Sequence, residues 1–441
     1  MANSRLYRAA VEFGLDRYII HKTFSLHKWR PTYVEDLLEN PPSATETRRL
    51  PSKTLADVVE ALIGAAYISG GTSKALACMS LFIPEFKWCS IEHGREVLCN
   101  EAPDDEPLPA TMRPLESLIG YTFNKKSLLV EAMTHPSCNG PSIRASLDRL
   151  EFLGDAILDY IIVKALFSIS SPSPLENSDL HLLRTALVNA DILGFLAMEW
   201  AINQDRFDVV TTSTPTFSST GNDANADAHT NVSITPSQTR LPLPSFLRHA
   251  SPDLGLAQRA AALRHARLRE AILHALWHGP HYPWALLCRL QAHKFHSDAV
   301  EALLGAVWVD SIGDDSNGDG DGMAACEAVA ERIGILKLMR RLVADRVWLL
   351  HPKEELGRLS GSSEVEYIVT QQVVFSPKDG PEGEAGEAGE RMFRCEVKVG
   401  GVVAGTAEGG LSREEARTRA AEDACARLKG EREGEGDGSK K

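Results

Sequence analysis

The stretch KTLADVVEALIGAAY, residues 53–67, returns 241 positions later as KFHSDAVEALLGAVW, residues 294–308. Each copy has the period of an apolar helix, with an aspartate and a glutamate three residues apart on one helical face. A charged pair on such a helix is costly to bury unless it is paired or binds a cation. The repetition predicts two duplicated helical domains and indicates a function for the acidic pair.

A second acidic string, LDRLEFLGDAILD, occupies residues 147–159. Its two inner acids are four residues apart and therefore stack on one face of a predicted helix. Gly154 between them permits another backbone to approach closely. Spacing alone also fits an ordinary solvated face, but the apolar surroundings favour a site for one or two hard divalent cations, which could support phosphodiester hydrolysis. Four carboxylates would form it: Glu151, Asp155, Asp298 and Glu301.

Length and composition set the class of protein. The 441 residues have room for about two or three domains. With 43% hydrophobic and 24% charged residues, the chain has an ordinary globular composition, and its net charge of -13 argues against indiscriminate nucleic-acid binding without excluding local basic surfaces. No apolar run reaches the roughly 20 residues of a bilayer span, and the eight scattered cysteines favour a reducing compartment. We expect an intracellular protein of the cytoplasm or nucleus, with no membrane partner.

The order of periodic segments predicts a mainly α-helical chain with a small C-terminal α+β domain. A segment at about 205–255, rich in Ser, Thr, Asn and Pro, is expected to be a disordered insertion. The C-terminal part alternates as α-β-β-β-α, with Ser412 as the N-cap of its last helix. The expected boundaries are 1–95 for a first helical domain, 96–112 for an acidic linker, 113–346 for the second, 351–430 for the C-terminal domain and 431–441 for a disordered tail.

Three motifs resemble those of the ribonuclease III family. LEFLGDAIL at 150–158 is similar to the family signature, AMTHPS at 132–137 to the segment before it, and SDAVEALLGA at 297–306 to the closing helix. They occur in the family's order within 113–346. Two such units followed by an α-β-β-β-α module resemble the C-terminal arrangement of Dicer-like proteins. The amino-acid sequence of the repeat is most similar to that of the fungal members.

The resemblance implies a helical endoribonuclease that hydrolyses double-stranded RNA with Mg²⁺, or with Mn²⁺ in its place. The products would carry 5′-phosphate and 3′-hydroxyl ends, and the implied biology is small-RNA production in RNA silencing, including antiviral defence. Lys294 matches a lysine of the eukaryotic members and is expected to contact the scissile phosphate, with a solvated helix-end lysine as the alternative. When the residues of this chain are matched one by one with the family motif, the resemblance implies four catalytic metal ligands: Glu151, Asp155, Asp298 and Glu301.

The first unit departs from the family pattern. Asp57 and Glu60 match the closing helix, but nothing upstream of them matches the signature helix. Two carboxylates alone should hold a divalent ion poorly, so we expect these to be vestigial and the first unit inactive. The chain is expected to be an N-terminally truncated C-terminal portion, or else a reduced paralogue. With one complete site it would nick one strand, whereas a homodimer joined through the second units would cut both.

The C-terminal module resembles a double-stranded-RNA-binding domain. Such domains read duplex RNA by shape and backbone contacts, with basic residues at the start of the last helix. The matching residues are Lys353, Arg413 and Arg417, but Glu414 stands where a basic residue is usual and weakens the expected attraction to phosphate. Two alternatives stay open: a module used for packing or protein contact, and a non-catalytic RNA-binding scaffold or inactive fragment for the whole chain.

A patch of aromatic and histidine residues lies within 277–284. It has no Cys/His spacing typical of a metal site, so packing is the favoured interpretation. Its members are Trp277, His278, His281, Tyr282 and Trp284.

Overall fold

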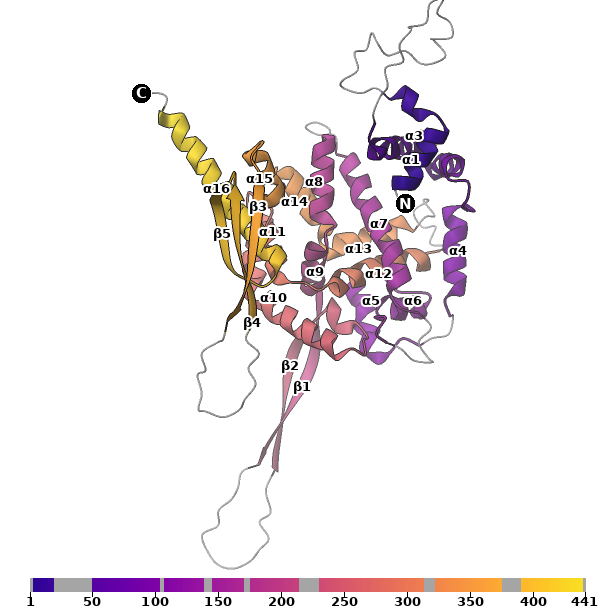
Figure 1. The fold of residues 1–441 in the computed structure, drawn as a ribbon. Helices are drawn as coiled ribbons and strands as arrows, with labels where there is room; N and C mark the ends of the chain where they lie inside the picture. The colour runs from indigo at the N-terminus through magenta and orange to yellow at the C-terminus, as the bar shows by residue number, and fades with distance from the viewer. Residues whose placement is uncertain are drawn as a thin grey trace, which may run out of the picture. The chain divides into compact units, whose positions relative to one another are not determined.

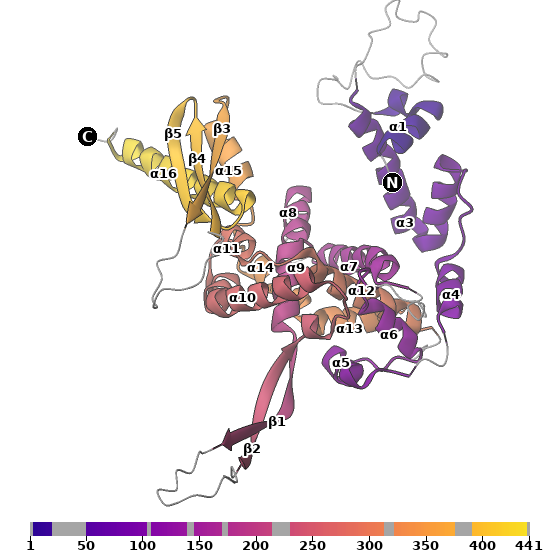
Figure 2. The ribbon, with the colours of Figure 1, turned by 60° about the horizontal axis from the view of Figure 1, so that its bottom comes forward.

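Two compact units, Met1–Glu101 and Ala102–Lys441, make up the chain. Helices predominate, and the predicted fold class is confirmed (Figures 1 and 2). The computed structural model describes residues 3–19, 50–103, 107–138, 145–169, 175–213, 230–312, 322–374 and 390–438.

The first unit is built on α3 (Ser52–Phe82), which is kinked at the non-helical residues Gly70 and Gly71, and α1 (Asn3–Glu12) packs on it (Figure 1). The 3₁₀ turn η1 (Leu15–Tyr18) follows α1, and α4 (Ile91–Glu101) is the last helix of the unit. The apolar stripes of α1 and the first part of α3 face each other, which gives the unit a small core. Its buried members are Leu6, Ala9, Ala10, Leu55, Ala56, Val59, Phe82 and Ile83.

The second unit is organised around α12 (Lys294–Asp310), in which every residue from Ala299 to Val309 is buried. A helix that is apolar on all sides belongs inside a core, which explains this central place. It packs mainly on α7 (Asp148–Phe167), α9 (Ala190–Glu199) and α6 (Lys126–Ala132). The other helical elements of this region are η3 (Ala110–Met112), α5 (Arg113–Ile119), α8 (Asn177–Leu187), α10 (Pro252–His278), α11 (Trp284–Leu290), α13 (Met323–Ile333) and α14 (Ile335–Ala344).

Two glycines allow the backbones of α7 and α12 to come into near contact. A Cβ atom added to Gly154 would lie 1.7 Å from the carbonyl oxygen of Glu301, and one added to Gly305 would lie 2.3 Å from that of Leu150. Real Cβ atoms do not approach backbone oxygens so closely, so only glycine fits either position. The close approach predicted at Gly154 is confirmed, and it brings the acidic residues of the two helices side by side.

An antiparallel hairpin occupies much of the range 205–255, where the sequence predicted disorder. Strand β1 (Ala201–Ser213) pairs with β2 (Thr230–Pro242), and the turn η4 (Leu243–Phe246) follows (Figure 2). The prediction was wrong there because it weighed the polar composition and overlooked β-branched Val, Ile and Thr residues, which favour strands. Residues 214–229 lie outside the described part.

The C-terminal module has the predicted α-β-β-β-α order. Helix α15 (Pro352–Ser360) precedes three antiparallel strands, and α16 (Arg413–Gly438) packs on the sheet (Figure 1). The strands neighbour one another in chain order: β3 (Val365–Val374), β4 (Glu390–Val399) and β5 (Val402–Gly410). Small side chains on α16 allow this close packing, and the core consists of Leu356, Cys395, Val397, Ala407, Ala416, Ala420, Ala421, Ala424 and Cys425.

Two segments expected to be irregular are helical instead. Residues 96–101 of the predicted acidic linker belong to α4, and residues 431–438 of the predicted tail continue α16. Both lie next to residues that already form helix, and adding a turn to an existing helix is easier than nucleating one. Their Glu and Arg residues have good helix propensity. Residues 104–106 and 439–441 lie outside the described part.

None of the described helices is by itself long and apolar enough to cross a bilayer. Helices α8 and α9 meet the length and hydropathy requirements only as a pair, and they are bent by 49° relative to each other. In α9, the residues from Ile192 to Met198 are buried within the second unit.

Replacing Gly154 with alanine should destabilise the second unit. The methyl group would collide with the Glu301 carbonyl oxygen, so the two helices would have to separate. Overfilling a packed interior costs about 1–3 kcal/mol, and a backbone collision lies at the upper end of that range. The urea midpoint of unfolding should therefore fall. Gly357→Ala in α15 is a matched control, because nothing lies within 4 Å of an added Cβ there. Equal midpoints for the two variants would contradict the close crossing.

Candidate active site

Three carboxylates meet where α7 crosses α12. One oxygen atom from each of Glu151, Asp298 and Glu301 lies within 4.8 Å of the other two. Glu151 belongs to the first turn of α7, whereas the other two lie three residues apart on one face of α12. In the described part of the chain, no other group of three or more His, Cys, Asp or Glu side chains meets this closely. Three oxygen ligands in this arrangement suit a hard divalent cation.

Asp155 is not one of the three acids that meet, although its charge acts on Glu301 more strongly than those of Asp298 and Glu151. The sequence predicted four converging acids, but the carboxylate of Asp155 is not among the atoms that meet, and the residue is exposed. Its charge still disfavours ionisation of Glu301 and favours the cationic form of Arg184. Acids four apart on a helix are about 5–6 Å from each other. Glu151 is therefore the α7 acid that meets those of α12, and Asp155 acts on Glu301 through its charge.

Lys294, the first residue of α12, lies between two of the carboxylates. Its Nζ donates hydrogen bonds to Glu151 and, at 2.6 Å, to Oδ1 of Asp298. Desolvation lowers the pKa of Lys294, but these hydrogen bonds outweigh it and hold the pKa above its ordinary value. The ammonium group is therefore the counter-ion of the cluster. Its side chain is 70% exposed, so it can also move toward solvent; contact with a phosphate stays a prediction.

Repulsion and burial oppose the ionisation of the acids on α12. Burial is the main cause that raises the pKa of Glu301 to about 7, and the charges of Asp155, Asp298 and Glu151 add to it. Burial also raises the pKa of Asp298, although the hydrogen bond from Lys294 opposes this. A cation placed among the three oxygens would remove the repulsion and favour the ionised forms. The donor set therefore fits a divalent metal ion.

The first-unit acids lack this environment. Asp57 is exposed, and its carboxylate pairs with Lys53, one turn earlier on the same helix. The distance between Lys53 Nζ and Asp57 Oδ2 is 3.0 Å. Glu60 is exposed as well. Within the described residues of the first unit, no third acid joins them to make a group that could hold a metal ion. The expectation that this unit is inactive stays a prediction.

Two of the three residues predicted to bind RNA, Lys353 and Arg413, have partners within the C-terminal module. Lys353 on α15 forms an ion pair with Glu414 at the start of α16. The guanidinium carbon of Arg413 lies 6.0 Å from the centre of the Phe393 ring. Arg413 is exposed, whereas Lys353 and Arg417 are half-buried. Arg413 is therefore the most accessible of the three, and their contact with RNA stays a prediction.

Glu415 ties the start of α16 to α11. Its buried carboxylate lies 2.9 Å from Nη1 of Arg289 and also pairs with Arg419. Ser412 accepts a hydrogen bond from the Glu415 backbone N–H, as predicted for the N-cap, and another from Nε2 of Gln291. Sequence reasoning missed this attachment, because nothing in the local pattern links Arg289 to an acid in another domain. The helix end expected to face RNA is partly used to hold the module in place.

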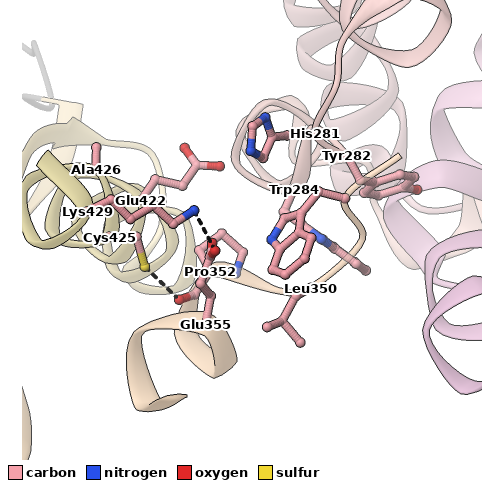
Figure 3. A pocket seen from close by; sticks show the side chains of 11 residues that line it. His281, Tyr282, Trp284, Leu350, Pro352, Glu355, Glu422, Cys425, Ala426 and Lys429 are labelled. Carbon is pink, nitrogen blue, oxygen red and sulfur yellow. Dashed lines mark hydrogen bonds and ion pairs between the residues drawn. The ribbon is translucent and has the colours of Figure 1, made fainter. Parts of the chain in front are cut away.

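The aromatic patch provides packing, as its sequence indicated. The Tyr282 hydroxyl donates to the carbonyl of Ala186 at 2.6 Å, and Trp284 Nε1 donates to that of Leu349 at 3.0 Å. Both side chains also line a pocket of about 360 Å³ that α16 helps to form (Figure 3). In that pocket Lys429 on α16 pairs with Glu355 on α15, as the dashed line in Figure 3 marks.

Comparison with known protein families identifies two regions. Residues 1–71 and 148–311 match the ribonuclease III domain, so the match includes α7 and α12. Residues 345–440 match the double-stranded-RNA-binding domain of Dicer-like protein 2. These matches agree with the two resemblances inferred from sequence motifs.

Fungal relatives align with almost the entire chain. Dicer-like protein 2 of Pyricularia oryzae is 46% identical over 96% of this chain, that of Cryphonectria parasitica 44% over 97%, and that of Neurospora crassa 41% over 98%. The matches cover 27%, 28% and 29% of those relatives, so the chain spans less than a third of their length. A solved nuclease domain of ribonuclease III from Campylobacter jejuni is 20% identical, covers 51% of this chain and 96% of that domain, and has a TM-score of 0.29.

Glu301→Gln should flatten the pH dependence of stability in the metal-free protein. The pKa of Glu301 is raised to about 7 in the folded state, whereas an unfolded glutamate titrates near 4.3. Between these values the folded state binds more protons, so the stability contributed by protonated Glu301 is present at low pH and is lost as the pH rises to about 7. The loss should be on the order of 2 kcal/mol.

Urea unfolding in EDTA at pH 5.5 and pH 8 measures this difference. Wild type should lose more stability between the two conditions than Glu301→Gln does. Glu60, the exposed counterpart of Glu301 in the first unit, gives a matched control. Glu60→Gln should keep the wild-type dependence of stability on pH. An unchanged dependence in Glu301→Gln would show that this carboxyl group does not titrate as stated.

Proposed function

The chain belongs to the ribonuclease III family, and on this basis we propose that its second unit cleaves double-stranded RNA as a divalent-cation-dependent endonuclease. The observation that carries the proposal is the meeting of Glu151, Asp298 and Glu301 at the crossing of α7 and α12. The matched ribonuclease III domain includes both helices and supports the same reading. The role in small-RNA production and antiviral silencing, in the cytoplasm or nucleus, is part of this proposal.

The three carboxylates would hold the ion, which we propose to be Mg²⁺, with Mn²⁺ as a substitute. A bound divalent ion lowers the pKa of water and stabilises charge on the leaving oxygen of a phosphodiester. Lys294 positions Glu151 and Asp298 through its two hydrogen bonds. Its exposure also allows the ammonium group to approach a phosphate of the RNA strand. Asp155, at the edge of the cluster, adds negative charge that attracts the cation.

The C-terminal module would bring duplex RNA to this unit. Its match to a double-stranded-RNA-binding domain supports this role. Arg413 is exposed and available for a phosphate, whereas the ion pair between Lys353 and Glu414 reduces the charge that Lys353 can offer. Fewer free cations imply weaker and less salt-dependent binding. The module therefore contributes shape recognition more than charge.

Pairing of two second units would allow both RNA strands to be cut. Phe152, next to Glu151 on α7, is 83% exposed, and Ala156 one turn later is exposed too. A contact between two chains at this face would remove the large Phe152 side chain from water, which is favourable. We therefore place the contact of the proposed homodimer on this face of α7.

Asp298→Ala should abolish Mg²⁺-dependent cleavage, because it removes one of three ligands at the centre of the cluster. Labelled duplex RNA incubated with Mg²⁺ measures the effect, and a loss of at least about a hundredfold is expected. Asp57→Ala is the matched control, since it removes the corresponding acid of the first unit and should leave cleavage unchanged. RNA binding without cleavage by the wild type would instead favour the non-catalytic scaffold.

Phe152→Asp should convert cleavage of both strands into single-strand nicking. The charge would prevent the apolar contact between second units while leaving the carboxylates of the same unit in place. Native and denaturing gels of the same digest distinguish the two products, and sedimentation measures association. Phe167→Asp, at a 68%-exposed position near the end of the same helix, controls for added charge. Association that persists in Phe152→Asp would exclude this face as the contact.

A further inference from the structure

The pocket beside α16 has aromatic walls and charges of both signs. Its volume is about 360 Å³, and a neighbouring cavity of about 490 Å³ shares Trp348, Glu355 and Lys429 with it (Figure 3). Cavities of about 300–1,000 Å³ bind small molecules in many proteins. Tyr282 and Trp284 form one wall, with ring centres 4.6 Å apart, and each is fixed by a hydrogen bond to a backbone carbonyl. This wall is therefore preformed.

Trp348 gives the pocket an open aromatic face. Its backbone is fixed, because its N–H donates to the carbonyl of Pro280 and its carbonyl accepts from the N–H of Tyr282, each at 2.9 Å. The residue is nevertheless 48% exposed. Cations and nucleic-acid bases both bind to a tryptophan face that is accessible in this way. Trp348 is thus placed to stack with a ligand.

The charged residues of the pocket differ in exposure. The Glu355 side chain on α15 is only 11% exposed, and its Oε1 lies 2.7 Å from Nζ of Lys429. The Lys429 side chain is 42% exposed, and its Nζ lies 5.8 Å from the centre of the Trp348 ring. Arg358, which lines the neighbouring cavity, is exposed. The pocket therefore has a buried hydrogen-bond acceptor and two cations that reach solvent.

We propose that this pocket binds a guanine nucleotide. The base would stack on Trp348, and its N1–H and N2–H groups would donate to the Glu355 carboxylate. The phosphate would lie near Lys429 and Arg358. A carboxylate only accepts hydrogen bonds, so it selects a base with donors side by side on its Watson–Crick edge. Guanine has two such donors, whereas adenine and cytosine place an acceptor nitrogen beside their amino group, which a carboxylate repels.

Lys429 occupies the place that the base would take. Its ammonium group lies over the Trp348 ring and is paired with Glu355. An ion pair with a partly exposed partner is weak and can exchange. On binding, Lys429 would turn from the carboxylate to the phosphate, so neither charge would lose its partner. A ligand with only positive charge would be repelled by Lys429 and Arg358, and a nucleotide is therefore the favoured class.

Two sources can supply this ligand: a free nucleotide, and an unpaired guanosine at the end of an RNA strand. Recognition of duplex RNA by shape requires neither, so the pocket would add base recognition to the C-terminal module. The residues that line the pocket and the neighbouring cavity do not include the three acids that meet at α7 and α12. Nucleotide binding can therefore be measured separately from RNA cleavage.

Isothermal titration calorimetry of the full chain in EDTA measures the binding of GMP and AMP. EDTA prevents a metal ion at the carboxylate cluster from binding phosphate. GMP should bind saturably and at least about tenfold more tightly than AMP. Trp348→Ala should weaken GMP binding at least about tenfold, because the base loses its stacking partner. Trp348→Leu keeps an apolar side chain for folding and should show the same loss.

Matched variants separate stacking from base selection. Phe167→Ala removes an exposed aromatic ring from α7, outside the pocket, and should bind GMP as wild type does. Glu355→Gln should reduce the preference for GMP over AMP to about threefold or less, since an amide has a single acceptor oxygen. Glu354→Gln, at the exposed position before it, should keep the preference. Circular dichroism and urea midpoints check the folding of each variant.

Short RNA duplexes, also in EDTA, distinguish the two sources. One duplex ends in an unpaired guanosine and the other in an unpaired adenosine. Tighter binding of the first duplex, lost in Trp348→Ala, would identify the RNA strand as the source. Equal binding of the two duplexes by a protein that binds GMP would identify the free nucleotide.

Four results would overturn the proposal. The first is no binding of GMP at concentrations up to about 1 mM. The second is GMP binding that neither Trp348 variant changes, because the nucleotide would then lie elsewhere. The third is equal affinity for GMP and AMP, which would exclude Glu355 as the selecting group. The fourth is Trp348-dependent binding of spermidine in place of GMP, which would make the pocket a site for organic cations.

Discussion

The rest of the structure depends on one constraint, the near contact of two helical backbones at Gly154 and Gly305. Because these two positions have no side chains, α7 and α12 approach closely enough for the residues that flank the glycines to pack against one another. The apolar residues then form the centre of the second unit, and three acids that precede the glycines on the two helices converge: Glu151, Asp298 and Glu301. The same contact provides packing energy and the geometry of the site. A packing residue is in this case also a determinant of function.

The acids that this contact brings together destabilise the fold that holds them. Glu301 is 9% exposed, so its charge loses hydration without gaining a full counter-charge, and the neighbouring acids add repulsion. Lys294 compensates in part through Glu151 and Asp298. A flexible, exposed ammonium group is a counter-ion that can be displaced, whereas a buried arginine would be held in place. The cluster thus contains acids that repel one another and a lysine counter-ion that can be displaced. Both features favour the uptake of a divalent ion.

Sequence reasoning succeeded where a short local pattern of residues is enough to specify the structure. The apolar helices, the glycine that permits their contact and the alternating strands of the C-terminal module all have periods that can be recognised in short windows. It failed where the outcome depends on crossing geometry or on distant partners. The spacing of Glu151 and Asp155 could not tell that only Glu151 belongs to the group of three acids that meet. The pair of half-buried Arg289 and buried Glu415 joins residues 126 positions apart. In the sequence, each of them alone looks like an ordinary surface charge. The hairpin at β1 and β2 was missed because polar composition was given more weight than β-branched content.

The repeated helix shows what an acidic pair needs, besides its spacing, to become a candidate metal site. Asp57 and Glu60 have the spacing of Asp298 and Glu301, and Lys53 pairs with Asp57 as Lys294 does with Asp298. Yet the first pair is exposed to solvent, whereas burial and the neighbouring acids raise the pKa of Glu301. Spacing on one helix therefore does not make the site. The second helix does, because it removes water, adds a third carboxylate and fixes the distance at which the acids repel one another. In this chain, the glycines that allow two helices to meet are as necessary for the proposed cation site as the carboxylates.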